Sequence, residues 1–246
     1  MLAEPADQRT LLNLADLDTE VAKIQHAARA LPQHQSIASL MASRQGVADA
    51  LVAAEIEVDD LAVAVRKAEA DLSPVKERLA RNQKRVADGS VADGKILRSL
   101  TDEVEHLSRR ISDLEDAELE LMGTLEEATE QRDKIAARKI DIEAKLRTEV
   151  EIRDEAVGQL KEAAQDLARA RVPMVARLPA DLLALYEKLR SATGMGAAPL
   201  AARRCGGCQL EATLSDLAEY RKAPANLVLR CGECDRILVR TPESGL

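Results

Sequence analysis

Aromatic residues are almost absent from this chain of 246 residues, which has two tyrosines and no tryptophan or phenylalanine. Globular cores of this size normally use aromatic side chains for bulk, so a thick conventional core is not expected. The same scarcity argues against a large β-sandwich or barrel. Charged residues make up 32% of the chain, and its apolar residues are mostly Ala, Leu and Val. This mixture is typical of long helices and coiled coils.

Long apolar runs are also missing. No stretch approaches the roughly 18 apolar residues that indicate a transmembrane helix. The first ten residues are acidic and polar, unlike a signal peptide. We therefore expect a cytoplasmic protein with no membrane partner.

Catalytic signatures are lacking as well. The sequence has no glycine-rich dinucleotide motif, phosphate loop or nucleophile elbow. Its three histidines, His26, His34 and His106, have no nucleophile or acid at a meaningful spacing, so we interpret them as exposed polar positions. We expect no enzymatic activity and no small-molecule substrate.

Heptad repeats dominate the part of the chain before residue 171. From Ile37 to Val86, apolar residues alternate at spacings of three and four, interrupted only by Arg44 and Asn82. A second register runs from Leu97 to Ala170. Such regularity indicates a coiled-coil seam. Polar residues interrupt the second register and could mark a register shift: Glu118, Arg132, Lys139, Glu149 and Arg153.

The segment between the two registers predicts a chain reversal. Residues 88–94 contain two Asp-Gly pairs, and Asp93 is a plausible N-cap for the returning helix. A flexible break between two unrelated helices is the alternative. The arms on either side have nearly equal lengths, which favours an antiparallel hairpin. Residues 11–31 could then pack as a third element beside the end of the long helix.

Prolines divide the rest of the helical part. We expect a break near Pro32, with Ser36 as a new N-cap, and a kink at Pro74. Pro173 and Pro179 should bracket a turn. A short amphipathic helix over residues 181–190 and a linker containing Gly194, Gly196 and Pro199 should follow.

The predicted fold class is therefore mainly α: a long antiparallel coiled-coil hairpin followed by a small four-cysteine ribbon built on a β-hairpin. We expect the coiled-coil hairpin over residues 1–172, with its turn near 88–94. A neck of short helix and linker should occupy 173–200, and the ribbon 201–246.

All four cysteines lie near the C-terminus, as two C-x2-C pairs separated by 22 residues: Cys205, Cys208, Cys231 and Cys234. Each pair can offer two sulfurs to one tetrahedral Zn²⁺ ion, so this spacing strongly indicates a single structural zinc ion. A redox motif, two disulfides and an iron–sulfur cluster are weaker alternatives. Residues 226–230 and 236–240 should form a hairpin around the second pair, and residues 215–220 a helical turn.

Charge is divided along the chain. Residues 1–170 hold 24 Lys and Arg against 35 Asp and Glu, whereas residues 171–246 hold 11 against 8. The C-terminal part is the better candidate for an anionic partner, although its arginines could also be solvated or pair with acidic residues. The predicted partner-binding residues are Arg203, Arg204, Arg221, Lys222, Arg236 and Arg240.

The ribbon motif resembles the bacterial C4-type zinc ribbon family, in which a long coiled-coil hairpin precedes the ribbon. The resemblance is carried by Cys205-Gly-Gly-Cys208, by Leu214-Ser215 and by the run from Cys231 to Leu238. Segments around Leu14 and Leu182 also look similar. The resemblance implies an adaptor or chaperone-like role, with a sigma factor, secretion or flagellar components, or messenger RNA as partners.

Two functions remain open. The first is an adaptor that binds RNA, DNA or a protein through the ribbon and the basic neck. The second is a structural coiled-coil protein or protein-only adaptor. The scarcity of aromatic residues argues against a stacking platform for single-stranded nucleic acid. An apolar seam permits either a monomer or a homodimer.

Overall fold

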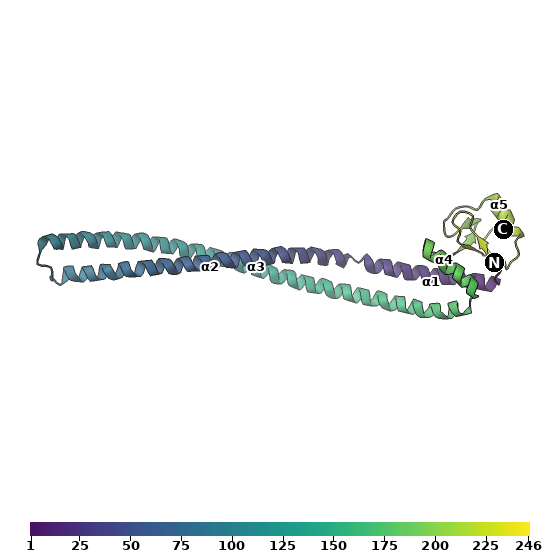
Figure 1. The fold of residues 1–246 in the computed structure, drawn as a ribbon, viewed down its shortest axis with the longest axis horizontal. Coiled ribbons are helices and arrows are strands. Elements are labelled where there is room, and N and C mark those ends of the chain that lie inside the picture. Colours follow the sequence, from purple (N-terminus) through teal and green to yellow (C-terminus); the bar gives the residue numbers. More distant parts are fainter. The chain divides into compact units, whose positions relative to one another are not determined.

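The computed structural model describes residues 1–246, and helices dominate it (Figure 1). The helices are α1 (Pro5–Arg29), α2 (Pro32–Ala87), α3 (Gly94–Arg177), α4 (Ala180–Thr193) and α5 (Leu214–Lys222). The strands are β1 (Ala197–Ala201), β2 (Arg204–Cys205), β3 (Leu229–Arg230) and β4 (Ile237–Arg240). The mainly α class, with a helical hairpin and a small strand-rich segment, is confirmed.

The chain divides into two compact units. One unit contains residues 35–150, and the other joins residues 1–34 to residues 151–246. The unit of residues 35–150 therefore consists of the helical hairpin alone. The second combines the N-terminal helix, the end of α3 and the ribbon.

The seam of the first unit follows the predicted heptads. On α2, every seam position from Ile37 to Val86 is buried or half-buried, except Arg44. On α3, the seam positions from Leu100 to Glu149 are covered as well, including the polar ones. An ion pair of 2.6 Å between Lys76 Nζ and Glu115 Oε1, and another between Arg78 and Glu103, connect the two helices. Packing thus tolerates the polar interruptions without ending the helix.

Residues 88–93 form the turn between α2 and α3. Asp93 Oδ1 accepts hydrogen bonds from the backbone amides of Lys95 (2.7 Å) and Ile96 (3.4 Å), so the predicted N-cap is confirmed. Asp88 Oδ1 accepts the amide of Ser90 at 3.0 Å. Hydrogen bonding with Ser90 lowers the pKa of Asp88. Both carboxylates of the turn are therefore engaged locally.

The prolines act differently from the predictions in two places. The break near Pro32 is confirmed, but α2 begins at Pro32 itself and not after Ser36. Proline fits the first helical position because its missing N–H has no helical partner there. Pro173 lies inside α3, which continues to Arg177, so the turn predicted to start at Pro173 is wrong. Proline costs one hydrogen bond there, and the helix continues on both sides of it. The helix α2 also runs through Pro74.

The predicted linker is in part a strand. The four strands form a sheet of order β2-β1-β4-β3, in which β1 is parallel to β4 and Pro199 lies opposite Val239. Gly194 ends α4 with a φ of +78° and donates its amide to Arg190 O at 2.8 Å. A Cβ on Gly196 would lie 2.4 Å from Tyr186 O. These glycines therefore bend the chain tightly from α4 into β1. The predicted antiparallel pairing of β3 with β4 is confirmed.

The sheet has a hydrophobic layer on each face. Ile237 and Val239 pack with α1 and α4, whereas Leu238 packs with α5 and two of the cysteines. This alternation is expected because successive side chains of a strand point to opposite faces. The layer shared with α1 and α4 contains Leu11, Leu14, Leu182 and Tyr186, all at most 1% exposed.

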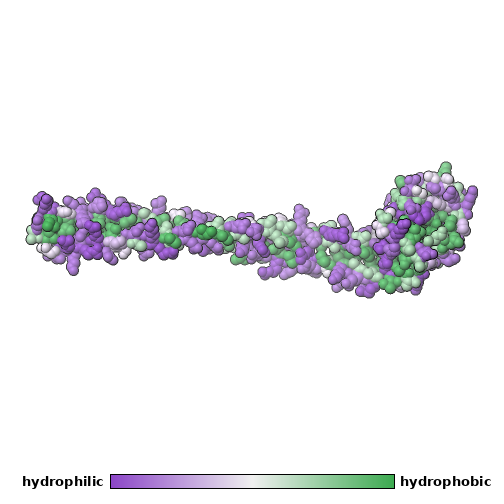
Figure 2. All heavy atoms as spheres, in the orientation of Figure 1, coloured by the Kyte–Doolittle hydropathy of each residue, from purple (hydrophilic) through white to green (hydrophobic).

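Hydrophilic residues cover most of the visible surface, and green apolar patches interrupt them (Figure 2). None of the helices combines the length and the apolar character needed to cross a membrane.

Candidate metal centre

The structure brings the four cysteines of the ribbon together. Cys205 ends β2 and Cys231 follows β3, the two outer strands of the sheet, and both cysteines pack with Leu238 of β4 on one of its faces. All four Sγ atoms lie within 4.8 Å of one another. Cys205 Sγ is 3.8 Å from Cys234 Sγ, and Cys208 Sγ is 3.8 Å from Cys231 Sγ.

These distances fit a tetrahedral metal site. A zinc–sulfur bond of about 2.3 Å places the sulfurs of a tetrathiolate about 3.8 Å apart. A disulfide would need a sulfur–sulfur distance of about 2.05 Å. The four thiols can therefore hold one metal ion, and because all four ligands come from the chain, no coordination position is left for a substrate.

The two cysteine loops have the same backbone conformation and the same pattern of backbone hydrogen bonds. The residue after the second cysteine, Gln209 or Asp235, has a left-handed φ of +64° or +59°. This conformation turns the chain so that amides of the loop approach the sulfurs. Gly207 N, for example, donates to Cys205 Sγ at 3.4 Å. The matching backbone bonds are Gln209 N to Cys205 O (2.7 Å), Asp235 N to Cys231 O (2.9 Å), Cys205 N to Leu210 O (3.0 Å) and Cys231 N to Arg236 O (3.0 Å).

Burial and hydrogen bonding act on the thiols in opposite directions. Burial raises the pKa of Cys205, and it raises the pKa of Cys231 to about 12. Burial also opposes ionisation of Cys234, but hydrogen bonds from the backbone and side chain of Arg236 and from neighbouring thiols outweigh it and lower its pKa to about 7. A metal ion must therefore displace protons from this cage, most easily at Cys234.

Arg236 connects the cysteine loops to the end of α4. Its Nε donates to Met195 O at 3.1 Å, and its Nη2 donates to Thr193 O at 3.0 Å. A Cβ on Gly207, in the first cysteine loop, would lie 2.8 Å from Arg236 Cδ. Arg236, predicted as a partner-binding cation, is thus occupied by contacts within the chain.

Arg240 is occupied in the same way. Its guanidinium donates to five backbone carbonyls that surround the end of α5, and partial burial lowers its pKa. Arg240 therefore holds the loop between α5 and β3. The accepting oxygens belong to Tyr220, Ala223, Pro224, Ala225 and Leu227, at 3.2–3.5 Å.

The other predicted partner-binding residues are exposed. Arg203 lies in the β1–β2 turn and Arg204 begins β2, where its Nη2 lies 3.4 Å from Glu211 Oε2. Arg203 has a φ of +65° and its amide donates to Ser244 O, so the C-terminal residues hold its backbone. Arg221 and Lys222 form the last turn of α5. Of these four exposed cations, Arg221 and Lys222 have no ion pair, whereas Arg203 Nε donates to Gly245 O at 3.3 Å and Arg204 pairs with Glu211.

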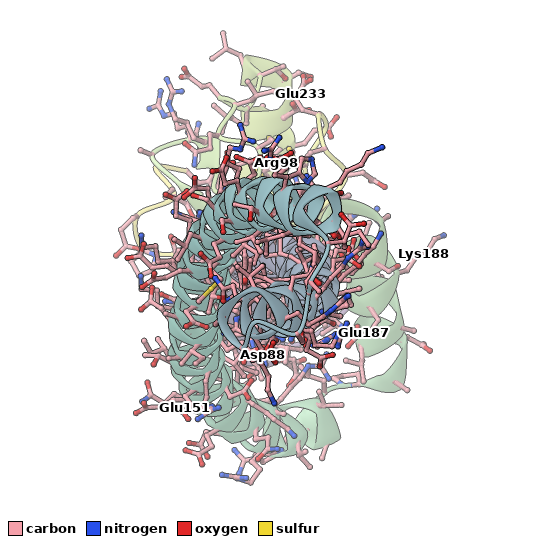
Figure 3. The ribbon with its side chains drawn as sticks, turned by 90° about the vertical axis from the view of Figure 1, so that its left-hand side faces the viewer. Asp88, Arg98, Glu151, Glu187, Lys188 and Glu233 are labelled. Atoms are coloured by element: carbon pink, nitrogen blue, oxygen red, sulfur yellow. The ribbon has the colours of Figure 1, made fainter.

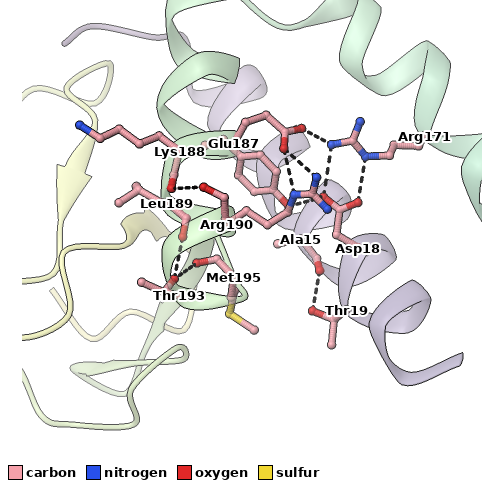
Figure 4. A network of polar contacts seen from close by, with 12 residues as sticks. Ala15, Asp18, Thr19, Arg171, Glu187, Lys188, Leu189, Arg190, Thr193 and Met195 are labelled. Atoms are coloured by element: carbon pink, nitrogen blue, oxygen red, sulfur yellow. Dashed lines mark hydrogen bonds and ion pairs between the residues drawn. The ribbon is translucent and has the colours of Figure 1, made fainter. Parts of the chain in front are cut away.

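Arg171, at the end of α3, and Arg190, in the neck, are partly neutralised by a network around the buried Asp18 and Tyr186 (Figure 4). Arg171 Nε donates to Asp18 Oδ1 at 2.8 Å, and Arg171 also pairs with Glu187. Arg190 Nη2 lies 2.8 Å from Glu187 Oε2. Tyr186, which is fully buried, donates its hydroxyl to Asp18 Oδ2 at 2.8 Å. The alternative that the neck arginines pair with acidic residues therefore holds for Arg171 and Arg190.

Asp18 and Tyr186 organise this network, and sequence reasoning gave neither of them a role. Asp18 is 153 positions away from Arg171, so no local spacing relates them. A signal did exist, because Asp18 lies four positions after Leu14 and three after Ala15, on the apolar side of α1. The three histidines are exposed, as interpreted.

The fold and site define a coiled-coil hairpin protein with a C-terminal cluster of four cysteines. Residues 14–194 match the family described as the CT398-like coiled coil hairpin domain, and the chain belongs to this family.

Relatives and solved structures support that assignment. The uncharacterized protein Rv2229c of Mycobacterium tuberculosis is 34% identical over 240 residues, 98% of each chain. ML1638 of Mycobacterium leprae is 28% identical over 236 residues, 94% of this chain and 95% of its own. A solved structure from Mycobacterium smegmatis has a TM-score of 0.85 at 34% identity, covering 98% of this chain and all of the other. CT398 from Chlamydia trachomatis, at 17% identity, shares the fold with a TM-score of 0.68 over 96% of this chain and 98% of its own.

Proposed function

We propose that this protein is a non-enzymatic adaptor, in which one Zn²⁺ ion holds the ribbon and the folded ribbon binds a protein partner. The observation that carries the proposal is the closed set of four sulfurs, with distances of 3.8 Å that suit tetrahedral zinc. A metal held by four chain ligands has a structural role, so the function is binding and not catalysis.

A protein partner is supported by the exposed apolar side chains of the ribbon. Leu214, the first residue of α5, is 84% exposed, and Leu210 is 52% exposed. Two exposed leucines beside a metal-held loop can supply the apolar part of a protein contact. Stacking on single-stranded nucleic acid is disfavoured, since Tyr186 and Tyr220 are both buried.

Nucleic acid is the second candidate partner, and the exposed cations of the ribbon favour it. Arg203, Arg204, Arg221 and Lys222 could neutralise phosphates without any base contact. Such binding would weaken steeply as salt rises.

The test separates the two partners with paired variants of the full chain. Leu210→Ser/Leu214→Ser should lose captured protein, and nuclease treatment should leave capture by the unmodified chain unchanged. Arg203→Glu/Arg204→Glu should lose captured RNA or DNA if the second candidate holds. Zinc content measured on each variant checks that the ribbon remains folded. Capture that disappears with nuclease and survives the leucine changes would overturn the protein-partner proposal.

A further inference from the structure

The outer side of α3 near the turn carries a row of charges with no partners inside the molecule. Lys95, Arg98, Asp102, Arg109, Asp113 and Asp116 are separated by three, four, seven, four and three positions. Such spacings keep residues along one side of a helix, and this side lies opposite the buried seam residues Leu100, Leu107 and Ile111.

All six residues of this charged row are exposed, and none of them forms an ion pair in the structure. Their neighbours behave differently, because Glu103 and Glu115 are paired with residues of α2. Figure 3 looks along the hairpin from its turn and shows Arg98 on the outside of the helix pair. The charged row is therefore available to another molecule.

The signs in the row are self-complementary. In chain order they are positive, positive, negative, positive, negative, negative. The spacing reads the same in both directions, whereas each sign becomes its opposite when the order is reversed. A second α3 laid antiparallel along the first therefore places every charge opposite one of the other sign.

We propose that the charged row is a homotypic docking surface, on which α3 of a second copy of this chain lies antiparallel. A two-fold axis between residues 105 and 106 then relates the copies, and each pairing occurs twice. The pairings are Lys95 with Asp116, Arg98 with Asp113, and Asp102 with Arg109.

Charges beyond the row favour the same alignment. Lys84 and Arg85, before the turn, are exposed and have no ion pair, and residues 84–98 hold four Lys or Arg against two Asp. Residues 111–131 of α3 contain eight acidic residues and no Lys or Arg. The antiparallel arrangement brings the basic turn of each copy to the acidic stretch of the other, which strengthens the attraction.

An apolar group of the acidic stretch gains a partner in this arrangement. Leu119, three positions after Asp116, is 64% exposed, and it would reach the level of residue 92 in the second copy. Gly123 has open space around its Cβ position, so packing within the chain does not require a glycine there. A glycine inside a helix is less stable than alanine, and close approach of another chain would explain it.

The dimer should be weak and sensitive to salt. Exposed ion pairs contribute little individually and are screened at moderate ionic strength. We expect the dissociation constant to rise by at least about tenfold between about 20 mM and about 500 mM salt, because the Debye length falls from about 20 Å to about 4 Å.

Sedimentation velocity of the full chain with charge-exchanged variants tests the surface. In low salt the unmodified chain should dimerise, whereas Lys95→Glu/Arg98→Glu alone and Asp113→Lys/Asp116→Lys alone should stay monomeric, because each sets like charges opposite one another. An equal mixture of the two variants restores every pairing and should form the heterodimer. Arg138→Glu/Lys161→Glu, at exposed positions outside the row, should dimerise like the unmodified chain.

Three results would overturn the proposal: a monomeric unmodified chain in low salt, single variants that dimerise normally, or a mixture that stays monomeric. Helical circular dichroism of each variant checks folding. The mixture also guards against a folding defect, since a misfolded variant could not regain a specific partner.

Discussion

Asn82 is the seam residue whose burial is least compensated. Its side chain is 7% exposed, and its Nδ2 atom has no hydrogen-bond partner. An unsatisfied buried amide costs about 1–3 kcal/mol, so Asn82→Leu should raise the free energy of unfolding by about that amount. The measurement is urea denaturation followed by circular dichroism. Gln83→Leu, at the exposed neighbouring position, should leave stability nearly unchanged, and a less stable Asn82→Leu variant would contradict this account of the seam.

Arg236 should tune metal binding without being a ligand. Its hydrogen bonds help to lower the pKa of Cys234 to about 7, so Arg236→Gln should raise that pKa. Because zinc binds thiolates, the variant should release half of its zinc at a higher pH than the unmodified chain does. The difference in bound zinc between the two proteins should be largest below about pH 7. Chelator competition across pH measures this shift. Arg221→Gln, in the exposed last turn of α5, is the control. If both variants released zinc at the same pH, the role of Arg236 would be refuted.

At the residue scale, the cysteines were predictable and the neck was not. The spacing of Cys205, Cys208, Cys231 and Cys234 is a local signal, since each pair must form one turn around an ion. Arg236 and Arg240 were predicted as free cations because their acceptors are backbone carbonyls, which every residue has and no sequence pattern marks. Their occupied guanidinium groups emerge only when the chain is folded.

Among the elements, the helices of the hairpin were predictable from their period. Heptads specify both the helix and its buried side, and the turn at residues 88–93 carries its own Asp-Gly signal. Strand β1 was missed because Ala197 and Ala198 are poor strand formers. Its parallel pairing with β4 joins residues about 40 positions apart, which no local pattern reports.

Docking of α4 should depend on Asp18. This carboxylate is 8% exposed and is shared by Arg171, Arg190 and Tyr186. Asp18→Ala leaves the fully buried Tyr186 hydroxyl without its acceptor, which costs about 1–3 kcal/mol, while both arginines keep Glu187. Hydrogen exchange of the amides of α4 should accelerate accordingly. Asp16→Ala, at an exposed position on the same helix, should change little, whereas equal protection in both variants would mean that the network does not hold α4.

At the scale of the whole molecule, the two compact units should respond differently to metal removal. Cys205 and Cys231 belong to the hydrophobic layer on one face of the sheet, so loss of the metal removes the support of that layer. Residues 35–150 have their own seam and no metal ligand. Chelation should therefore abolish amide protection in residues 197–240 and preserve it in residues 35–150.

Hydrogen exchange with mass spectrometry, with and without a zinc chelator, measures this difference. Cys205→Ser/Cys208→Ser should reproduce the effect without the chelator. A ribbon that keeps its protection after complete metal removal would show that its hydrophobic layers suffice. Loss of protection in both units would show that the hairpin also depends on the metal.

X-ray absorption at the zinc edge, on the full chain purified under reducing conditions, tests the central claim most directly. The account predicts one zinc ion per chain, surrounded by four sulfur atoms at about 2.3 Å. A chain without stoichiometric zinc, or an ion with nitrogen or oxygen among its nearest neighbours, would contradict it.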